Sequence, residues 1–218
     1  PIAADNDTDF SLENAGAYMT APPTRDDVKR DFAGLRPLAA SEDVGAATKE
    51  ISRHHKVTVS TTGLVSILGG KWTTYRKMAE DLINTVQSVG GLPERTCTTQ
   101  NLPIYGYDYN SDWTDPLHVY GTDIEKIKSL SRNGNSSLSD EIHLTSNQIR
   151  WAVQEEMAQT VEDVLARRTR ALFLNARESH RLAPEVATIM AKEMKKNNAW
   201  INNEIQHFQE LSLRYQLQ

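Results

Sequence analysis

The sequence predicts an α+β fold, in which a small β-hairpin is followed by a mainly α-helical bundle. Two patterns predict it. Apolar and polar residues alternate between residues 56 and 68, the period of a strand, and a turn at residues 61–63 divides that stretch in two. Beyond residue 116, apolar residues recur every three or four positions, the period of a helix.

Length and composition exclude several classes of protein. The 218 residues can form one large or two small domains, with a net charge of -5. The longest apolar runs, such as residues 171–174, fall far short of the roughly 18 residues that cross a bilayer. The single Cys97 cannot build a disulfide framework, so a reducing interior is expected. Basic residues are spread evenly among acidic ones, so nucleic acid is not an expected partner.

In the first part of the chain we expect a short helix over residues 24–32, with an acidic first turn. The hairpin follows over residues 56–68. After Gly69 and Gly70 the apolar spacing becomes helical and continues to Gly90.

Residues 91–115 are rich in turn residues and predict a connector. In the helical half, Thr145 with Gln148 and Thr160 with Asp163 resemble N-terminal capping pairs. One apolar stripe in steps of four is expected on a single helical face: Ile149, Val153, Met157, Val161 and Leu165.

Two familiar motifs are present only in part, because the sequence lacks residues that each of them requires. Asp5, Asp7 and Asp9 suggest a calcium loop, but the positions that require Gly and Glu hold other residues, so no metal site is expected. Gly70 and Lys71 suggest a P-loop, but the required earlier glycine and following hydroxyl residue are missing.

The order strand, two glycines, lysine and helix is still informative. It brings a backbone close to a ligand at a helix N-terminus, where free N–H groups and the helix dipole favour an anion. An ordinary strand-to-helix turn capped by a threonine remains the alternative. Arg36 and Arg53 lie in or beside the strand region, and either an ion pair or an anion site would explain them.

Read in order, several strings resemble the carboxy-terminal portion of FAD-dependent glycerol-3-phosphate dehydrogenase. They are TRDDV (24–28), FAGLRPL (32–38), ISRHH (51–55), GLV (63–65), GGKWTTYRKMAED (69–81) and RRTRALFLN (167–175). The dinucleotide fingerprint G-x-G-x-x-G of this family is absent. We therefore expect the remnant of an FAD and substrate domain over residues 1–90, a connector over 91–115 and a helical C-terminal domain over 116–218.

The resemblance implies oxidation of glycerol 3-phosphate to dihydroxyacetone phosphate, with hydride transfer to FAD and electrons passed to a quinone acceptor. It implies that Arg36 and Arg53 bind the substrate phosphate, and that Lys71 is catalytic. The cofactor would be held by Gly70, Lys71, Trp72, Thr73 and Thr74. The catalytic base is unassigned, with His55 as a candidate.

The resemblance also implies a missing N-terminal FAD domain, so we expect the chain alone to be inactive and to bind no flavin. A bacterial-type enzyme, located in the cytoplasm and peripheral to the inner face of the cell membrane, is expected, and a homodimer is possible within the family. Two alternatives remain open: a glycerol-3-phosphate oxidase that uses oxygen, and a non-catalytic helical interaction module.

Overall fold

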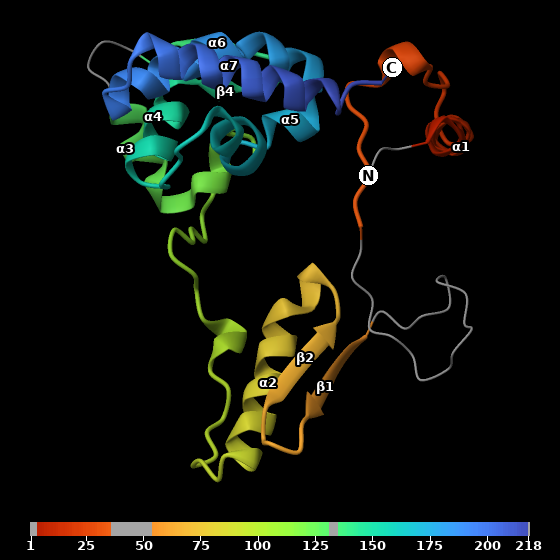
Figure 1. Ribbon diagram of the computed structural model, residues 1–218, viewed down its shortest axis with the longest axis vertical. Coiled ribbons are helices and arrows are strands. Elements are labelled where there is room, and N and C mark those ends of the chain that lie inside the picture. The colour runs from red at the N-terminus through yellow and green to blue at the C-terminus, as the bar shows by residue number, and fades with distance from the viewer. Residues whose placement is uncertain (1–3, 36–53, 131–134, 218) are drawn as a thin grey trace. The chain divides into compact units, whose positions relative to one another are not determined.

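The computed structural model describes residues 4–35, 54–130 and 135–217, and it is drawn in Figure 1. The chain divides into two compact units. The helical unit combines Pro1–Gly34 with Gly106–Gln218, and the hairpin unit is Leu35–Tyr105. Helices dominate and the strands are few and short, which confirms the predicted α+β class.

The hairpin unit begins with the predicted β-hairpin. Strands β1 (His55–Val59) and β2 (Val65–Gly69) are antiparallel, with His55 opposite Gly69. The predicted turn contains Gly63 at a φ of 85°, a left-handed conformation that glycine adopts without strain.

Helix α2 (Tyr75–Val89) follows the hairpin after one 3₁₀ turn, η2 (Trp72–Thr74), and packs on both strands. This confirms the helix predicted after the twin glycines. The remaining residues of the unit hold one further 3₁₀ turn, η3 (Thr99–Asn101). No residue between 54 and 105 is fully buried.

The N-terminal part of the helical unit differs from the prediction. Helix α1 (Asp5–Gly16) forms where no element was expected. The helix predicted over residues 24–32 is wrong: only a 3₁₀ turn, η1 (Arg25–Asp27), is present. The chain then extends because its backbone pairs with distant residues, as Asp31 N–H donates to the Tyr215 carbonyl at 2.7 Å.

The helical half contains a small two-stranded sheet in addition to its helices. Its first elements are η4 (His118–Asp123), α3 (Ile124–Ser129), α4 (Ser146–Gln154) and a π-helix, η5 (Asp163–Arg168). Then come α5 (Ala171–Leu174), α6 (Ala176–Met194) and α7 (Asn198–Leu213), of which α6 and α7 lie side by side (Figure 1). The sequence patterns missed one small antiparallel sheet of β3 (Ser137–Ser139) and β4 (Leu144–Thr145).

The helical unit has a dense apolar core. Its largest fully buried side chains include Phe208, Leu172, Ile149, Leu182 and Met190. Both predicted capping pairs are confirmed: Gln148 N–H donates to Thr145 Oγ1 at 3.4 Å, and Asp163 N–H donates to Thr160 Oγ1 at 3.1 Å.

The predicted apolar stripe through Met157 is wrong at that residue. Helix α4 ends at Gln154, and Met157 has a φ of 56° and is 79% exposed. The chain turns between the two helices there, which a step of four cannot reveal.

Candidate functional site

The glycine turn that leaves strand β2 requires glycine. Gly69 and Gly70 have φ values of 73° and 84°, both left-handed. A Cβ on Gly70 would lie 2.4 Å from Met78 Sδ and 3.3 Å from His55 Cβ. Side chains of helix α2 and strand β1 therefore pack closely against the backbone of this turn, without room for a side chain at Gly70.

Lys71 follows the glycines, and its backbone is fixed by Thr74. The Thr74 hydroxyl donates to the Lys71 carbonyl at 2.9 Å and accepts from the Lys71 N–H at 3.3 Å. The Thr74 hydroxyl thus closes the 3₁₀ turn, and it makes no side-chain cap hydrogen bond to α2, so the expected threonine cap of that helix is wrong. In the described part of the chain, the Lys71 ammonium group takes no ion pair or hydrogen bond.

The aromatic residues beside Lys71 are exposed. Trp72 is 87% exposed and its ring lies 5.7 Å from that of Tyr75, measured between centroids. Thr73 is exposed as well. The backbone therefore brings the five predicted cofactor-binding residues, 70–74, to one corner of the unit, with the larger side chains left uncovered.

A pocket of 210 Å³ lies beside the turn and is lined by His54, His55, Lys71, Thr74 and Lys77. The residues that line it are two lysines, two histidines and one threonine, but Asp81 contacts both His55 and Lys77, and the surface that faces the pocket is mostly carbon. Lys71 is therefore the lysine of this lining whose charge could attract an anionic group. The volume is below the roughly 300 to 1,000 Å³ of small-molecule sites, so the pocket can take only part of a large ligand.

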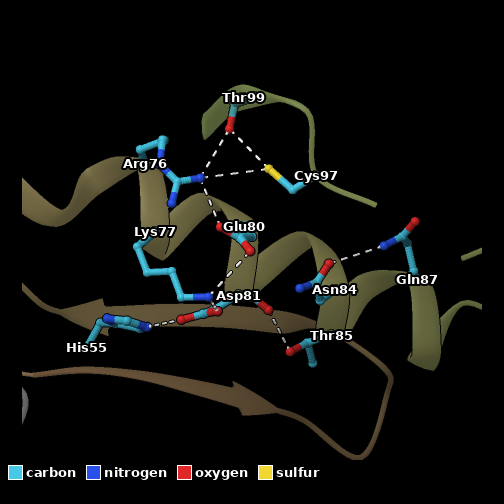
Figure 2. A network of polar contacts seen from close by, with 10 residues as sticks. All are labelled: His55, Arg76, Lys77, Glu80, Asp81, Asn84, Thr85, Gln87, Cys97 and Thr99. Carbon is cyan, nitrogen blue, oxygen red and sulfur yellow. Dashed lines mark hydrogen bonds and ion pairs between the residues drawn. The ribbon is translucent and has the colours of Figure 1, made fainter. Parts of the chain in front are cut away.

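A polar network ties strand β1 to helix α2 (Figure 2). His55 Nε2 lies 2.9 Å from Asp81 Oδ2, and Lys77 Nζ lies 2.8 Å from Asp81 Oδ1. Hydrogen bonds from Lys77 and then His55 hold the pKa of the Asp81 carboxyl below its usual range. Asp81 therefore stays ionised and holds both partners.

A second set of contacts joins α2 to the connector (Figure 2). Arg76 Nη1 lies 2.9 Å from Glu80 Oε2, 3.4 Å from Thr99 Oγ1 and 3.8 Å from Cys97 Sγ. The hydrogen bond from Arg76 lowers the pKa of Glu80, and hydrogen bonds to Thr99 lower that of the Cys97 thiol.

The structure describes some of the predicted site residues and not others. Lys71 and Thr74 line the pocket and Gly70 directly precedes them in the turn, whereas Arg36 and Arg53 lie outside the described residues. Their convergence with Lys71 stays a prediction. The contacts of Asp81 were missed, because a carboxylate inside a helix gives no sequence signal of its partner on a strand.

The arginine cluster at residues 167–170 has local partners. Arg167 pairs with Glu162, and the Arg168 guanidinium donates to the Glu156 carbonyl at 2.7 and 2.9 Å. These contacts favour a structural role for the cluster over an anion site.

The described residues offer neither a metal site nor a membrane-spanning helix. Within residues 4–35, 54–130 and 135–217, no group of three or more His, Cys, Asp or Glu side chains is arranged to hold a metal ion. Over the same ranges, no helix combines the length and the apolar character needed to cross a membrane.

The comparisons with known proteins agree on one family. Residues 60–200 match the family described as the C-terminal domain of alpha-glycerophosphate oxidase. That match includes the glycine turn, α2 and most of the helical unit.

Curated relatives are similar over most of the chain. A probable mitochondrial glycerol-3-phosphate dehydrogenase of Caenorhabditis elegans is 33% identical over 89% of this chain and 30% of the relative. The mitochondrial glycerol-3-phosphate dehydrogenase of Mesocricetus auratus is 31% identical over the same shares. A probable one of Dictyostelium discoideum is 31% identical over 96% of this chain and 37% of the relative.

The chain thus spans about a third of the length of these relatives. The family match covers more than half of the chain, and the glycine turn lies inside it. The chain belongs to the family defined by the C-terminal domain of alpha-glycerophosphate oxidase.

Proposed function

We propose that this chain is the C-terminal part of an FAD-dependent glycerol-3-phosphate dehydrogenase. The longer protein would oxidise sn-glycerol 3-phosphate to dihydroxyacetone phosphate and pass the electrons to a quinone acceptor. The observation that carries the proposal is the left-handed glycine turn, which places Lys71, without an ion pair, at a small pocket in a chain of this family.

The residues present fit one edge of a flavin. Gly69 and Gly70 keep the turn free of side chains, while the N–H groups of Thr74 and Tyr75 at the start of the helix donate to the carbonyls of Lys71 and Trp72. Lys71, Trp72, Thr73 and Thr74 would hold the pyrimidine edge. When bound, FAD supplies an acceptor for the hydride of the secondary alcohol.

The chain's own chemistry at that edge is electrostatic. The Lys71 ammonium and the positive helix end would stabilise negative charge that develops during reduction, so Lys71 is the proposed catalytic residue. The remainder of FAD would be held by an N-terminal FAD domain of the longer protein.

In this proposal, Arg36 and Arg53 bind the phosphate group of the substrate. A guanidinium offers a planar fork of donors that matches phosphate oxygens and stays charged at any relevant pH. Arg53 directly precedes His54, which lines the pocket beside Lys71. That sequence neighbourhood supports a substrate phosphate near the glycine turn.

Location and assembly are further parts of the proposal. The family resemblance favours a protein peripheral to the inner face of the cell membrane, in the cytoplasm, and allows a homodimer. The relatives named above are mitochondrial enzymes, which favours a mitochondrial membrane instead. Fractionation of cells that express the tagged longer protein distinguishes the two locations.

The alternatives predict other observations. An oxidase would deliver electrons to oxygen, and peroxide formation during turnover would identify it. An interaction module would offer an apolar groove among the helices. The pocket between α6 and α7 presents a mostly apolar surface, to which Ile205 and Leu213 contribute beside polar side chains such as His180 and Gln209, so this alternative stays open.

The test of the function uses the longer protein loaded with FAD. Arg53→Ala should raise KM for glycerol 3-phosphate and lower kcat/KM by about 10²-fold, because a charge-assisted phosphate contact is lost. Arg95→Ala, at an exposed arginine of the same unit, is the matched control. Unchanged kinetics of Arg53→Ala would remove that residue from the site.

The 218-residue chain alone provides a second test. Because it lacks the dinucleotide fingerprint, we expect it to purify without flavin absorbance. A stoichiometric yellow protein would contradict the assignment of most FAD contacts to the N-terminal domain.

A further inference from the structure

We propose that His55, tethered by Asp81, is a positioning residue that fixes the Gly69–Gly70–Lys71 turn for its contact with flavin. The inference rests on the proposed function and deepens it, because it assigns a role to a residue that does not itself touch the reacting atoms.

The first argument is packing on the turn. His55 lies opposite Gly69 in the strand register, so it is next to the point where β2 runs into the turn. Its Cβ lies 3.3 Å from the place where a Cβ of Gly70 would stand. Met78 of α2 closes the other side of the same backbone. The turn is therefore held between a strand residue and a helix residue.

The second argument is the orientation of the imidazole. His55 is partly buried, and its Nε2 makes a hydrogen bond of 2.9 Å to Asp81 Oδ2. Lys77 occupies the other carboxylate oxygen at 2.8 Å, so Asp81 is held in place from within its own helix. Figure 2 shows His55, Asp81 and Lys77 meeting between the strand and the helix.

The third argument is the shared pocket. His55, Lys71 and Lys77 line the same 210 Å³ space. Since Lys77 and His55 are both committed to Asp81, Lys71 is the lysine of that lining whose charge is available. A movement of His55 would shift the turn on which Lys71 stands, and so weaken the electrostatic effect of Lys71 at the cofactor.

The experiment is a sulfite titration of the flavin-loaded longer protein. Sulfite adds to the flavin ring and leaves negative charge at its pyrimidine edge, so its affinity reports the positive charge that the turn supplies. His55→Ala should weaken sulfite binding about tenfold, the effect of one lost hydrogen bond. His55→Gln keeps a donor for Asp81 and should restore most of the affinity.

A double variant and a control variant make the test more specific. In a protein that already carries Asp81→Ala, His55→Ala should have little further effect on sulfite affinity, because the hydrogen bond between the two residues is already absent. Gln87→Ala removes a hydrogen bond between α2 and Arg95 at the far end of the helix, and it should leave sulfite affinity unchanged.

Unchanged sulfite affinity in His55→Ala, with flavin still bound, would overturn the proposal. If His55→Ala yields no flavoprotein, His55→Phe removes the hydrogen bond to Asp81 without opening a cavity, and unchanged affinity there has the same meaning. Lys71→Met separates the two hypotheses. If Lys71→Met has no effect, the proposed flavin contact fails; if it alone weakens binding, only the role of His55 fails.

Discussion

The two units of the chain are stabilised in different ways. The helical unit has a core of side chains with almost no exposed surface, such as Phe208 at 1% and Leu172 at 0%. In the hairpin unit, between residues 54 and 105, no residue is fully buried, and Leu68 and Ile83 are 53% and 54% exposed. Two strands and one helix offer too little area for a core of their own.

That difference has a consequence for function. Apolar burial stabilises the helical unit, whereas the hairpin unit depends on a glycine turn and on polar tethers such as His55 with Asp81. Hydrogen bonds of this kind fix a few atoms but leave the surrounding surface exposed to solvent. The unit with the weaker core is therefore the one in which backbone and cationic groups remain open to a ligand.

The largest expected effect is on the helical core. Phe208→Ala should lower the free energy of unfolding by about 3 to 5 kcal/mol, because it removes a large buried ring and leaves a cavity. Urea unfolding followed by circular dichroism measures it. Phe10→Ala, at a residue that is 67% exposed, is the matched control. Equal effects of the two would contradict the contrast between core and surface.

The next effect is on the glycine turn. Gly70→Ala and Gly63→Ala both place a side chain at a similar left-handed φ, 84° and 85°. Only Gly70 has atoms near the new methyl group, with Met78 Sδ at 2.4 Å. Gly70→Ala should cost about 1 to 3 kcal/mol more than Gly63→Ala, because overpacking adds to the backbone strain.

Thermal unfolding of these two variants provides the comparison. Since Met78 is a flexible side chain, Gly70→Ala/Met78→Ala should recover part of the difference. Equal stabilities of Gly63→Ala and Gly70→Ala would show that the turn is not packed as described.

A pH effect is expected in the helical unit, where the pKa of Glu178 is strongly lowered. Two hydrogen bonds from Arg181, at 2.6 and 2.8 Å, lower the pKa of Glu178 from 4.5 to about 2. A lowered carboxyl pKa stabilises the fold above pH 4.5, and that stabilisation is lost as the pH falls from there towards 2. We expect a loss of about 1 to 2 kcal/mol, reduced by solvent screening of the exposed Arg181.

Unfolding experiments across this pH range check the effect. Glu178→Gln should remove that part of the pH dependence and should be less stable at neutral pH. An unchanged acid profile in Glu178→Gln would show that other carboxyl groups cause the dependence.

The smallest effect concerns a helix cap. Thr145→Ala should lower the stability of the helical unit by about 1 kcal/mol, because the Gln148 N–H at the start of α4 loses its acceptor. Thr145→Ser keeps the hydroxyl and should lie close to the unsubstituted protein. Chemical denaturation measures the free energy of unfolding of both variants. Equal losses of stability in Thr145→Ala and Thr145→Ser would show that the helix cap is not the cause.

The sequence predicted the elements whose signals are local. The hairpin, helix α2 and the caps at Thr145 and Thr160 follow from period, turn and capping residues over a few positions. The helix predicted over residues 24–32 failed because distant groups, such as the Tyr215 carbonyl, compete for its backbone. Local propensity cannot include such a partner.

The candidate site shows the same limit. Residues 70–74 could be singled out because they are consecutive in the chain, and their role in binding a cofactor stays a prediction. Asp81 was missed because its role depends on His55, 26 positions away on a strand. The short strands β3 and β4 were missed because two or three residues give no detectable period.

The most direct test of the central claim is the rate at which glycerol 3-phosphate reduces the flavin in a Lys71→Met variant of the longer protein, measured without oxygen. If Lys71 on the glycine turn stabilises charge at the cofactor, the loss of oxidised flavin absorbance should be about 10²-fold slower than in the unsubstituted protein. An unchanged rate with flavin fully bound would contradict the account.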